Sequence, residues 1–215
     1  MPNLLSLLLI GAWIALILFG AFISKLFLVN KKEFSRKIVH IGIGPILPLA
    51  WWLDISSGIA ISISSLITIA LLINYRMKLI DIFEDVERKS YGTIAYGISI
   101  TFLLIFFWSS SPESVCAAVL VMAFGDGFAG LIGKQVKSRN WTILGQHKSI
   151  VGTSTMGLIT GIVLYLVNLI SGSALNPLEI FAITCMATGL EQISPLGIDN
   201  LTVPIGVVIG WQYLA

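Results

Sequence analysis

Apolar stretches separated by short polar segments run along the whole chain. A helix needs roughly 20 apolar residues to cross a bilayer, and shorter or tilted helices also occur. Eight segments fit this description: 4–24, 38–53, 59–75, 91–108, 115–133, 150–170, 178–193 and 201–214. The second, seventh and eighth are short, so seven spans plus a re-entrant segment is the alternative. The pattern predicts an all-α fold, a polytopic transmembrane helical bundle of seven to eight spans.

Composition indicates that the surface of the protein faces lipid rather than water. Of the 215 residues, 56% are hydrophobic and 11% are charged, whereas soluble domains usually carry about 25% charged residues. We expect residues 1–215 to form a single integral membrane domain, because no stretch is left for a second soluble module. The net charge of +2 is too small to indicate a nucleic-acid partner.

Positive charges are sorted along the chain. All 13 Lys and Arg residues fall in three alternate connections, within 25–37, 76–89 and 134–148. The positive-inside rule therefore predicts that these connections face the cytosol, with both termini outside if there are eight spans. Four tryptophans fall near the predicted outer ends, where an aromatic belt would lie: Trp51, Trp52, Trp108 and Trp211. The apolar N-terminal stretch lacks the features of a signal or transit peptide, which favours a bacterial inner membrane.

Glycines mark faces where helices can approach closely in lipid. Two GxxxG pairs begin at Gly157 and Gly206, and three further glycines recur toward the end of 115–133. Such faces serve contacts within one subunit or between subunits, so the pattern leaves the oligomeric state open. Residues 76–89 differ, because apolar positions could share one face with acidic ones largely opposite. They predict either a helix lying at the membrane interface or an ordinary solvated loop.

Polar side chains inside apolar segments are costly, so each one needs a reason. At the start of 38–53, His40 lies four residues after Arg36 and three after Lys37, so the three share one helix face. This face could hold phosphate groups. Alternatively, the two cations anchor the helix end and the histidine bonds within the bundle.

Asp126 lies deep in the segment 115–133, roughly 10 Å from its cytosolic end at 1.5 Å per residue. An unpaired carboxylate at that depth would be protonated or would bind a cation. Mg²⁺ held together with substrate phosphates is one solution, and a buried ion pair with a lysine is the other. The flanking Gly125 and Gly127 would let a bulky polar ligand approach the backbone.

A third polar group surrounds the start of 150–170. Lys134, Lys148, Ser149 and Gly152 combine cations, a hydroxyl and a glycine at a helix N-terminus, where free N–H groups favour anions. The stretch is not a Walker P-loop, because GxxxxGK[ST] is absent.

A fourth group, Glu191, Asp199 and Asn200, lies in the turn between 178–193 and 201–214. It predicts the second half of a metal or substrate site, and helix capping by Asp199 or Asn200 is the structural alternative. All four groups fall at or near the predicted cytosolic ends, in separate parts of the chain. This joint position favours one convergent site.

Five stretches spread over residues 36–205 read RKIVH, ERKSYGTIAYG, GDGFAGLIGK, HKSIVGTSTMG and LEQISPLGIDNLTVPI. In this order they resemble the motifs of the phytol kinase and dolichol kinase family, the CTP-dependent polyprenol kinases, and most of all its small bacterial phytol kinases. Members are polytopic membrane enzymes that transfer phosphate to a long-chain alcohol, usually from CTP with a divalent metal. The resemblance implies a kinase of lipid metabolism that acts on phytol, geranylgeraniol or a similar isoprenoid alcohol. Phytol as substrate would also suit a photosynthetic membrane.

The resemblance also implies roles for particular residues. Catalytic roles fall to Asp126, Lys148, Glu191 and Asp199. The ligands of Mg²⁺ would be Asp126, Glu191 and Asp199. Contacts to CTP, its phosphates or the alcohol would come from Arg36, Lys37, His40, Gly125, Gly127, Lys134, Ser149, Gly152 and Asn200.

Three other functions stay open. Phosphatidate cytidylyltransferases have a similar Asp…Gly…Lys…Gly series, but their Lys-Asp followed by Pro-Gly-His-Gly-Gly is absent here. A CTP-dependent diacylglycerol kinase has a similar motif set. In a membrane transporter, Asp126 and Glu191 would mark an ion path, although the chain has no internal repeat. The residues alone determine neither the alcohol and its chain length nor the choice of CTP over ATP.

Overall fold

The computed structural model describes residues 4–27, 32–77 and 91–215. Its elements in chain order are α1 (Leu4–Phe27), α2 (Lys32–Ile43), α3 (Ile46–Trp52), α4 (Ser57–Met77), α5 (Gly92–Phe107), α6 (Pro112–Leu120), the π-helical segment η1 (Val121–Asp126), α7 (Gly127–Gln135), β1 (Asn140–Ile143), β2 (Gln146–Ser149), α8 (Ile150–Ser171), α9 (Pro177–Ile193) and α10 (Asp199–Leu214). The predicted all-α class is confirmed, with one short antiparallel hairpin added among the described residues. The predicted interfacial helix at 76–89 falls almost entirely on 78–90, outside the described residues.

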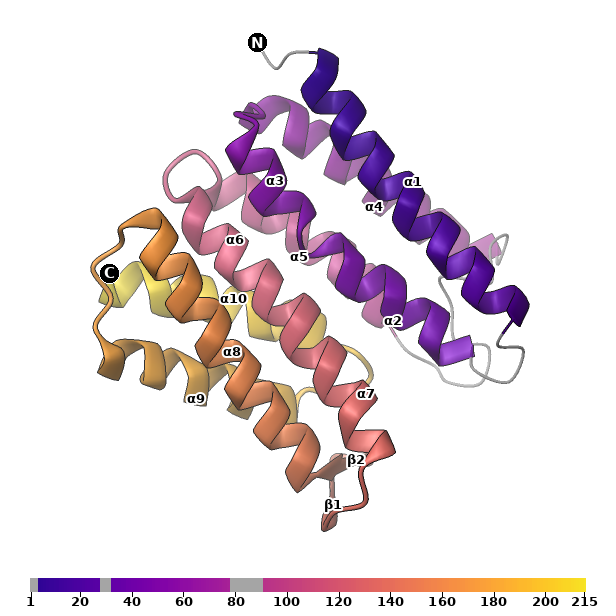
Figure 1. Cartoon of the computed structure of the whole chain (residues 1–215), viewed down its shortest axis with the longest axis vertical. Helices are drawn as coiled ribbons and strands as arrows, with labels where there is room; N and C mark the ends of the chain where they lie inside the picture. The colour runs from indigo at the N-terminus through magenta and orange to yellow at the C-terminus, as the bar shows by residue number, and fades with distance from the viewer. Residues whose placement is uncertain (1–3, 28–31, 78–90) are drawn as a thin grey trace.

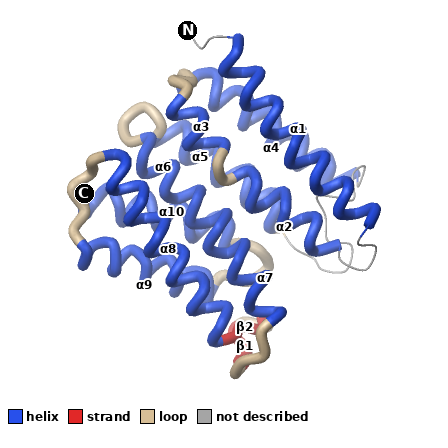
Figure 2. The backbone as a smooth tube through the Cα atoms, in the orientation of Figure 1, coloured by secondary structure: helices blue, strands red, loops and turns tan. Residues whose placement is uncertain are grey.

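The helices form a bundle that has two distinct ends. In Figure 1, α1, α2 and α4 lie on one side, α8, α9 and α10 lie on the other, and α6 and α7 run between them. The hairpin, drawn in red in Figure 2, lies where α7 ends and α8 begins. The start of α1 and the end of α10 lie toward the opposite end of the bundle (Figure 1).

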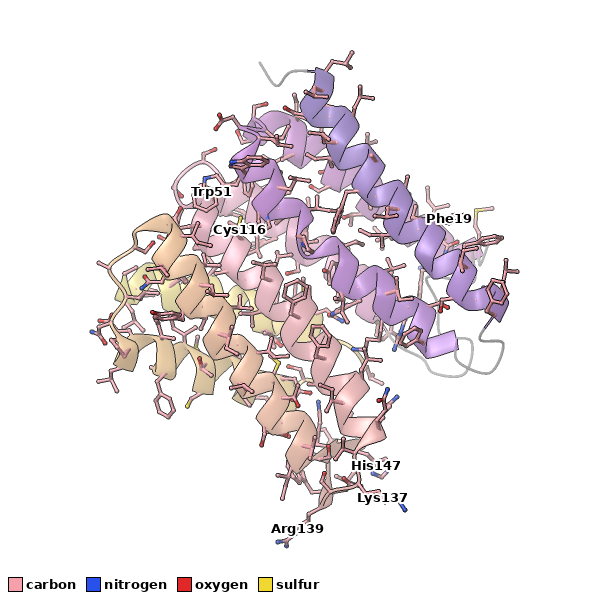
Figure 3. All side chains as sticks on the ribbon, viewed as in Figure 1. Phe19, Trp51, Cys116, Lys137, Arg139 and His147 are labelled. Carbon is pink, nitrogen blue, oxygen red and sulfur yellow. The ribbon has the colours of Figure 1, made fainter. Side chains whose placement is uncertain are left out.

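Basic residues gather at the hairpin end. Lys25, Arg76 and Lys134 lie in the last turns of α1, α4 and α7, which all end there (Figure 1). Lys137 and Arg139 extend from the same end in Figure 3. The charge sorting along the sequence therefore corresponds to a polarity of the folded bundle. Which end faces the cytosol stays a prediction.

Several helices have the length and composition of membrane spans. Among the described residues, four are long and apolar enough: Leu4–Phe27, Ser57–Met77, Pro112–Gln135 and Ile150–Ser171. Gly92–Phe107 is apolar but shorter, and the count of seven to eight spans stays a prediction. The predicted segment 38–53 is divided into α2 and α3 beside Pro45, which has no N–H to continue the helical ladder. A Cβ on Gly44 would lie 2.6 Å from that of Ala123, so this break packs tightly against η1.

The GxxxG pairs pack helices within the subunit. Cβ atoms on Gly206 and Gly210 would lie 2.4 Å from Leu190 and 2.9 Å from Met186, so α10 fits closely against α9. On the neighbouring helix α8, the pair that begins at Gly157 faces threonine hydroxyls of α9 at 3.6 and 3.7 Å. The packing role predicted for these glycines is confirmed.

The core is divided unevenly between the two sides. The main cluster centres on α6, where Val115 and Cys116 are buried and Cys116 lies inside the bundle in Figure 3. A second, small cluster joins α1 to α2 through Ile17, Ala21 and Val39. The outer surface of α1 is apolar and open, as Phe19 illustrates in Figure 3.

Two tryptophans do not lie where the aromatic-belt prediction put them. Trp108 and Trp211 are 6% and 1% exposed, and the indole N–H of Trp108 donates to the carbonyl of Ile55 at 3.2 Å. They are core residues, so the prediction is wrong for both. Trp52, in contrast, is 79% exposed at the end of α3.

The sequence did not predict the hairpin. Its turn consists of Leu144 and Gly145, with φ values of 49° and 77°. Positive φ at both central residues is what a tight two-residue hairpin requires, and glycine adopts it without strain. The hairpin matters for the site, because β2 carries Lys148 and Ser149 to the start of α8.

Candidate active site

Asp126 is held between two side chains of α2. It is the last residue of η1, a π-helical segment of the kind that often occurs at functional sites. The ammonium of Lys37 lies 2.8 Å from Asp126 Oδ2 and 3.3 Å from the Asp126 carbonyl. A Cβ on Gly130 would lie 3.1 Å from this ammonium, so the glycine leaves room for it. The buried ion pair that the sequence left as an alternative is therefore present.

His40 forms the other side of this arrangement. Its Nε2 lies 3.3 Å from Asp126 Oδ2 and 3.1 Å from the Met122 carbonyl. Because both neighbours are acceptors, Nε2 carries a proton. Tyr96 fixes the helix from α5, since its hydroxyl donates to the His40 carbonyl at 3.0 Å and its ring packs edge-on against the imidazole.

A second ion pair joins the hairpin to α9. The ammonium of Lys148 contacts Glu191 Oε1 and donates to the Glu191 carbonyl at 2.9 Å. The other carboxylate oxygen accepts from the amide of Gln192 at 2.6 Å, and that amide also donates to Thr153 at 2.9 Å. Glu191 is thus fixed from both sides although it comes from a distant part of the chain.

Three carboxylates converge between these pairs. Ligand oxygens of Asp126, Glu191 and Asp199 all lie within 4.8 Å of one another, although they come from η1, α9 and α10. Carboxylates so close repel one another unless cations compensate them. Lys37 and Lys148 place positive charge against two of the three carboxylates, those of Asp126 and Glu191.

The donor set fits a hard divalent cation. Mg²⁺ takes oxygen ligands and is commonly bound through one or two carboxylates together with substrate phosphates. Beside the cluster, the side-chain oxygens of Asn200 and Gln192 are buried without a hydrogen-bond partner among the described residues. Buried polar atoms normally have a partner, so these two are oxygen atoms near the carboxylates whose bonding capacity is unused. The residues therefore suit the metal that the sequence predicted.

The start of α8 closes the site against α7. Ser149 caps the helix by accepting from the Gly152 N–H at 3.1 Å, and its hydroxyl lies 3.4 Å from the Gly133 carbonyl. A Cβ on Gly133 would lie 3.0 Å from the Gly152 Cα, so only glycines allow this approach. Ser149 therefore has a capping role in addition to any contact with a nucleotide.

One cavity of about 1250 Å³ brings most of the predicted site together. The predicted residues that line it are Arg36, Lys37, His40, Asp126, Lys134, Lys148, Ser149, Gly152, Glu191, Asp199 and Asn200. We call this region the polar end of the cavity. The remainder of the wall comes mainly from aliphatic side chains of α1, α3, α4 and α5.

Two predicted site residues, Gly125 and Gly127, lie outside the lining of the cavity. A Cβ on Gly125 would lie 2.7 Å from the sulfur of Met156, and one on Gly127 would lie 2.4 Å from Ile41. Neither glycine lines the cavity, because neighbouring helices cover both. They allow α2 and α8 to approach the Asp126 region and do not expose backbone to a ligand.

The sequence assigned no individual role to three neighbours of the site: Tyr96, Thr153 and Gln192. Tyr96 lies in the stretch SYGTIAYG, and Gln192 directly follows Glu191. Each is polar within or beside an apolar segment, which was the signal available.

Known proteins resemble the chain over most of its length. A phytol kinase of Synechocystis sp. (strain ATCC 27184 / PCC 6803 / Kazusa) is 36% identical over 187 residues, covering 85% of this chain and 80% of that protein. A probable phytol kinase 3, chloroplastic, of Glycine max is 28% identical, covering 83% of this chain and 62% of the relative. A farnesol kinase, chloroplastic, of Arabidopsis thaliana is 26% identical, covering 61% and 47%.

The chain thus spans less than two thirds of these two plant relatives, and four fifths of the cyanobacterial one. No family model and no solved structure matches it. The cyanobacterial match extends over nearly the whole chain, and the motifs noted in the sequence supply the residues that converge in the cavity. The chain belongs to the phytol kinase family.

Proposed function

We propose that this protein is a kinase that transfers the γ-phosphoryl group of CTP to the hydroxyl of a long-chain isoprenoid alcohol, such as phytol or geranylgeraniol. One observation supports this above all: three carboxylates and two lysines meet at one end of a cavity whose other walls are largely apolar. Such a cavity suits a substrate with one polar end and a hydrocarbon tail. The relatives named phytol kinase and farnesol kinase agree with this substrate class.

Phosphoryl transfer depends on positioning and on neutralising charge. Asp126, Glu191 and Asp199 would hold Mg²⁺, which when bound supplies positive charge to the phosphate oxygens. Lys37 and Lys148 lie beside these carboxylates, within reach of the same phosphates. A carboxylate or similar base at the polar end would accept the hydroxyl proton of the alcohol.

The start of α8 is the proposed nucleotide side of the site. Lys134, Ser149 and Gly152 line the cavity there, where a cation, a hydroxyl and the dipole of a helix N-terminus favour anions. The choice of CTP over ATP comes from the resemblance to the family, since no described residue can be named as reading a cytosine.

The active site is proposed to face the cytosol. It lies at the hairpin end, where the described basic residues gather. Loops rich in Lys and Arg stay cytosolic in multi-pass proteins, so the positive-inside rule supports this orientation.

The direct test uses purified protein in nanodiscs with Mg²⁺, phytol and CTP labelled at either the γ- or the α-phosphate. We expect label in the lipid product only from the γ position. Label from the α position with phosphatidate as acceptor would instead establish a cytidylyltransferase. Transfer from the γ position to diacylglycerol but not to phytol would establish a diacylglycerol kinase. No transfer from either position by folded protein would favour a transporter.

A further inference from the structure

The cavity continues far beyond the charged residues. Between the pair α1–α2 and the pair α4–α5 it is lined by aliphatic side chains, among them Ile10, Leu47, Ile63 and Ile100. We call this region the apolar arm. It is continuous with the polar end, since one cavity contains both Asp126 and Ile10.

The arm extends far along two helices. Along α4 its lining runs from Asn74, near the polar end, to Ala60, about 21 Å away at 1.5 Å per residue. Along α5 it runs from Thr93 to Leu104. A long channel of this kind suits a single extended hydrocarbon chain.

The side of the arm is open between α1 and α4. Leu18, Ile63 and Ile67 line the cavity and are 39%, 42% and 46% exposed. α1 packs mainly on α2 and α3, whereas α4 packs mainly on α5. The backbones of α1 and α4 therefore make little contact with each other. The two helices with the most lipid-like exposed surfaces therefore border the opening (Figure 1).

We infer that the isoprenoid tail enters sideways from the bilayer between α1 and α4 and lies in the apolar arm, and that the depth of the arm limits the tail length. This inference rests on the proposed function, because the hydroxyl must reach the polar end for phosphoryl transfer. A tail in the arm buries apolar surface, while the hydroxyl meets the carboxylates and lysines. The tail stays out of water throughout.

Gly11 offers a way to shorten the arm without disturbing the fold. It lines the cavity, and a Cβ built on it meets nothing within 4 Å. Gly11 lies far from the polar end of the cavity. On the same helix, Gly20 lies against Ile38, which is next to Lys37. Gly11 is about 14 Å further along α1. A bulky side chain at position 11 would therefore occupy the deep part of the arm.

The test compares Gly11→Phe with wild type on geraniol, farnesol and geranylgeraniol, which lengthen by one isoprene unit at each step. We expect kcat/KM for geranylgeraniol to fall at least about tenfold relative to that for geraniol. Gly58→Phe is the matched control, because a Cβ at Gly58 also meets nothing within 4 Å and Gly58 does not line the cavity. Its length preference should equal that of wild type. An unchanged preference in Gly11→Phe would overturn the inference.

A binding experiment separates this inference from the proposed function. A geranylgeraniol analogue with a photoreactive diazirine at its tail end is crosslinked to the protein in nanodiscs, and the labelled residues are mapped by mass spectrometry. We expect label on lining residues near the far end of the arm, such as Leu47 and Ala60, reduced in Gly11→Phe but not in Gly58→Phe. Label confined to other surfaces would overturn the tail site even if the enzyme is active. Label in the arm without phosphorylation would preserve the tail site and refute the kinase.

Discussion

The two regions of the cavity are built in opposite ways. At the polar end, Lys37, Asp126, Lys148 and Glu191 come from distant parts of the chain, and each is held by an ion pair or hydrogen bonds at fixed positions. The apolar arm is lined by interchangeable aliphatic side chains, and parts of it are open to the outside. Phosphoryl transfer depends on exact placement of charge, whereas a flexible tail needs only length and an apolar wall. Substitutions at the two ends should therefore differ greatly in effect.

The largest effect is expected from Asp126→Asn, which removes charge but keeps size. The rate of phosphoryl transfer should fall about 10²- to 10³-fold, because the site loses a proposed metal ligand and Lys37 loses its anionic partner. The rate is measured with γ-labelled CTP and phytol. Asp54→Asn, at an exposed position between α3 and α4, is the control and should keep the wild-type rate. More than a tenth of the wild-type rate in Asp126→Asn would remove this residue from the reaction.

Lys148→Met should lower both rate and stability. It leaves Glu191 charged in a site where the two side chains are 11% and 9% exposed, which costs about 3 kcal/mol of unfolding free energy. We expect the rate to fall about 10²-fold. Rate and thermal unfolding are measured on the same preparation.

The double variant Lys148→Met/Glu191→Gln separates the two contributions. Removing the unpaired charge of Glu191 should restore most of the thermal stability but none of the activity. Recovery of activity together with stability would mean that the pair is structural only.

A smaller effect is expected from Asp199→Asn, through the metal. Chelation should abolish the wild-type rate and Mg²⁺ should restore it. In the variant, the Mg²⁺ concentration for half-maximal rate should rise about tenfold or more, as for other weakened metal sites. Glu113→Gln, at the other end of the bundle, serves as control. A rate that chelators do not change would contradict the metal assignment.

The smallest effect is expected in the apolar arm, from Thr68→Val. The Thr68 hydroxyl bonds that of Thr101 at 3.0 Å, so the variant should lose about 1 kcal/mol of stability. Its turnover of phytol should change less than about twofold, because the arm uses no polar contact to hold the tail. Thermal unfolding and the labelled assay measure both quantities. A loss of turnover above tenfold would show that a hydroxyl in the arm takes part in recognition, and the contrast between the two regions would fail.

Much of the polar end was predictable because burying charge in an apolar segment is costly. Asp126, Glu191 and Asp199 each interrupt or border an apolar run, and their joint position at one predicted membrane face favoured a site. The same reasoning failed for Gly125 and Gly127, because a glycine beside a functional carboxylate can serve a ligand or a neighbouring helix equally well. In the structure both glycines serve helix packing, because Gly125 lies against Met156 and Gly127 against Ile41.

The apolar arm was not predictable at the level of residues. Aliphatic side chains that face lipid, core or cavity look the same in the sequence, as Trp108 and Trp211 also illustrate. The hairpin was not predicted either. Its turn has a leucine at positive φ, where Asn or Gly is usual, so the sequence carries no clear turn signal.

The sequence by itself determined the helical class, the sorting of basic residues to one end and most of the polar residues that gather in the cavity. These follow from the free energy of exposing or burying polar groups, which each segment reveals locally. Only the tertiary structure decided that Lys37 pairs with Asp126 and Lys148 with Glu191, and that the site opens into an apolar arm. Partners and cavities depend on how helices far apart in the chain pack together, because small residues set how closely each pair can approach.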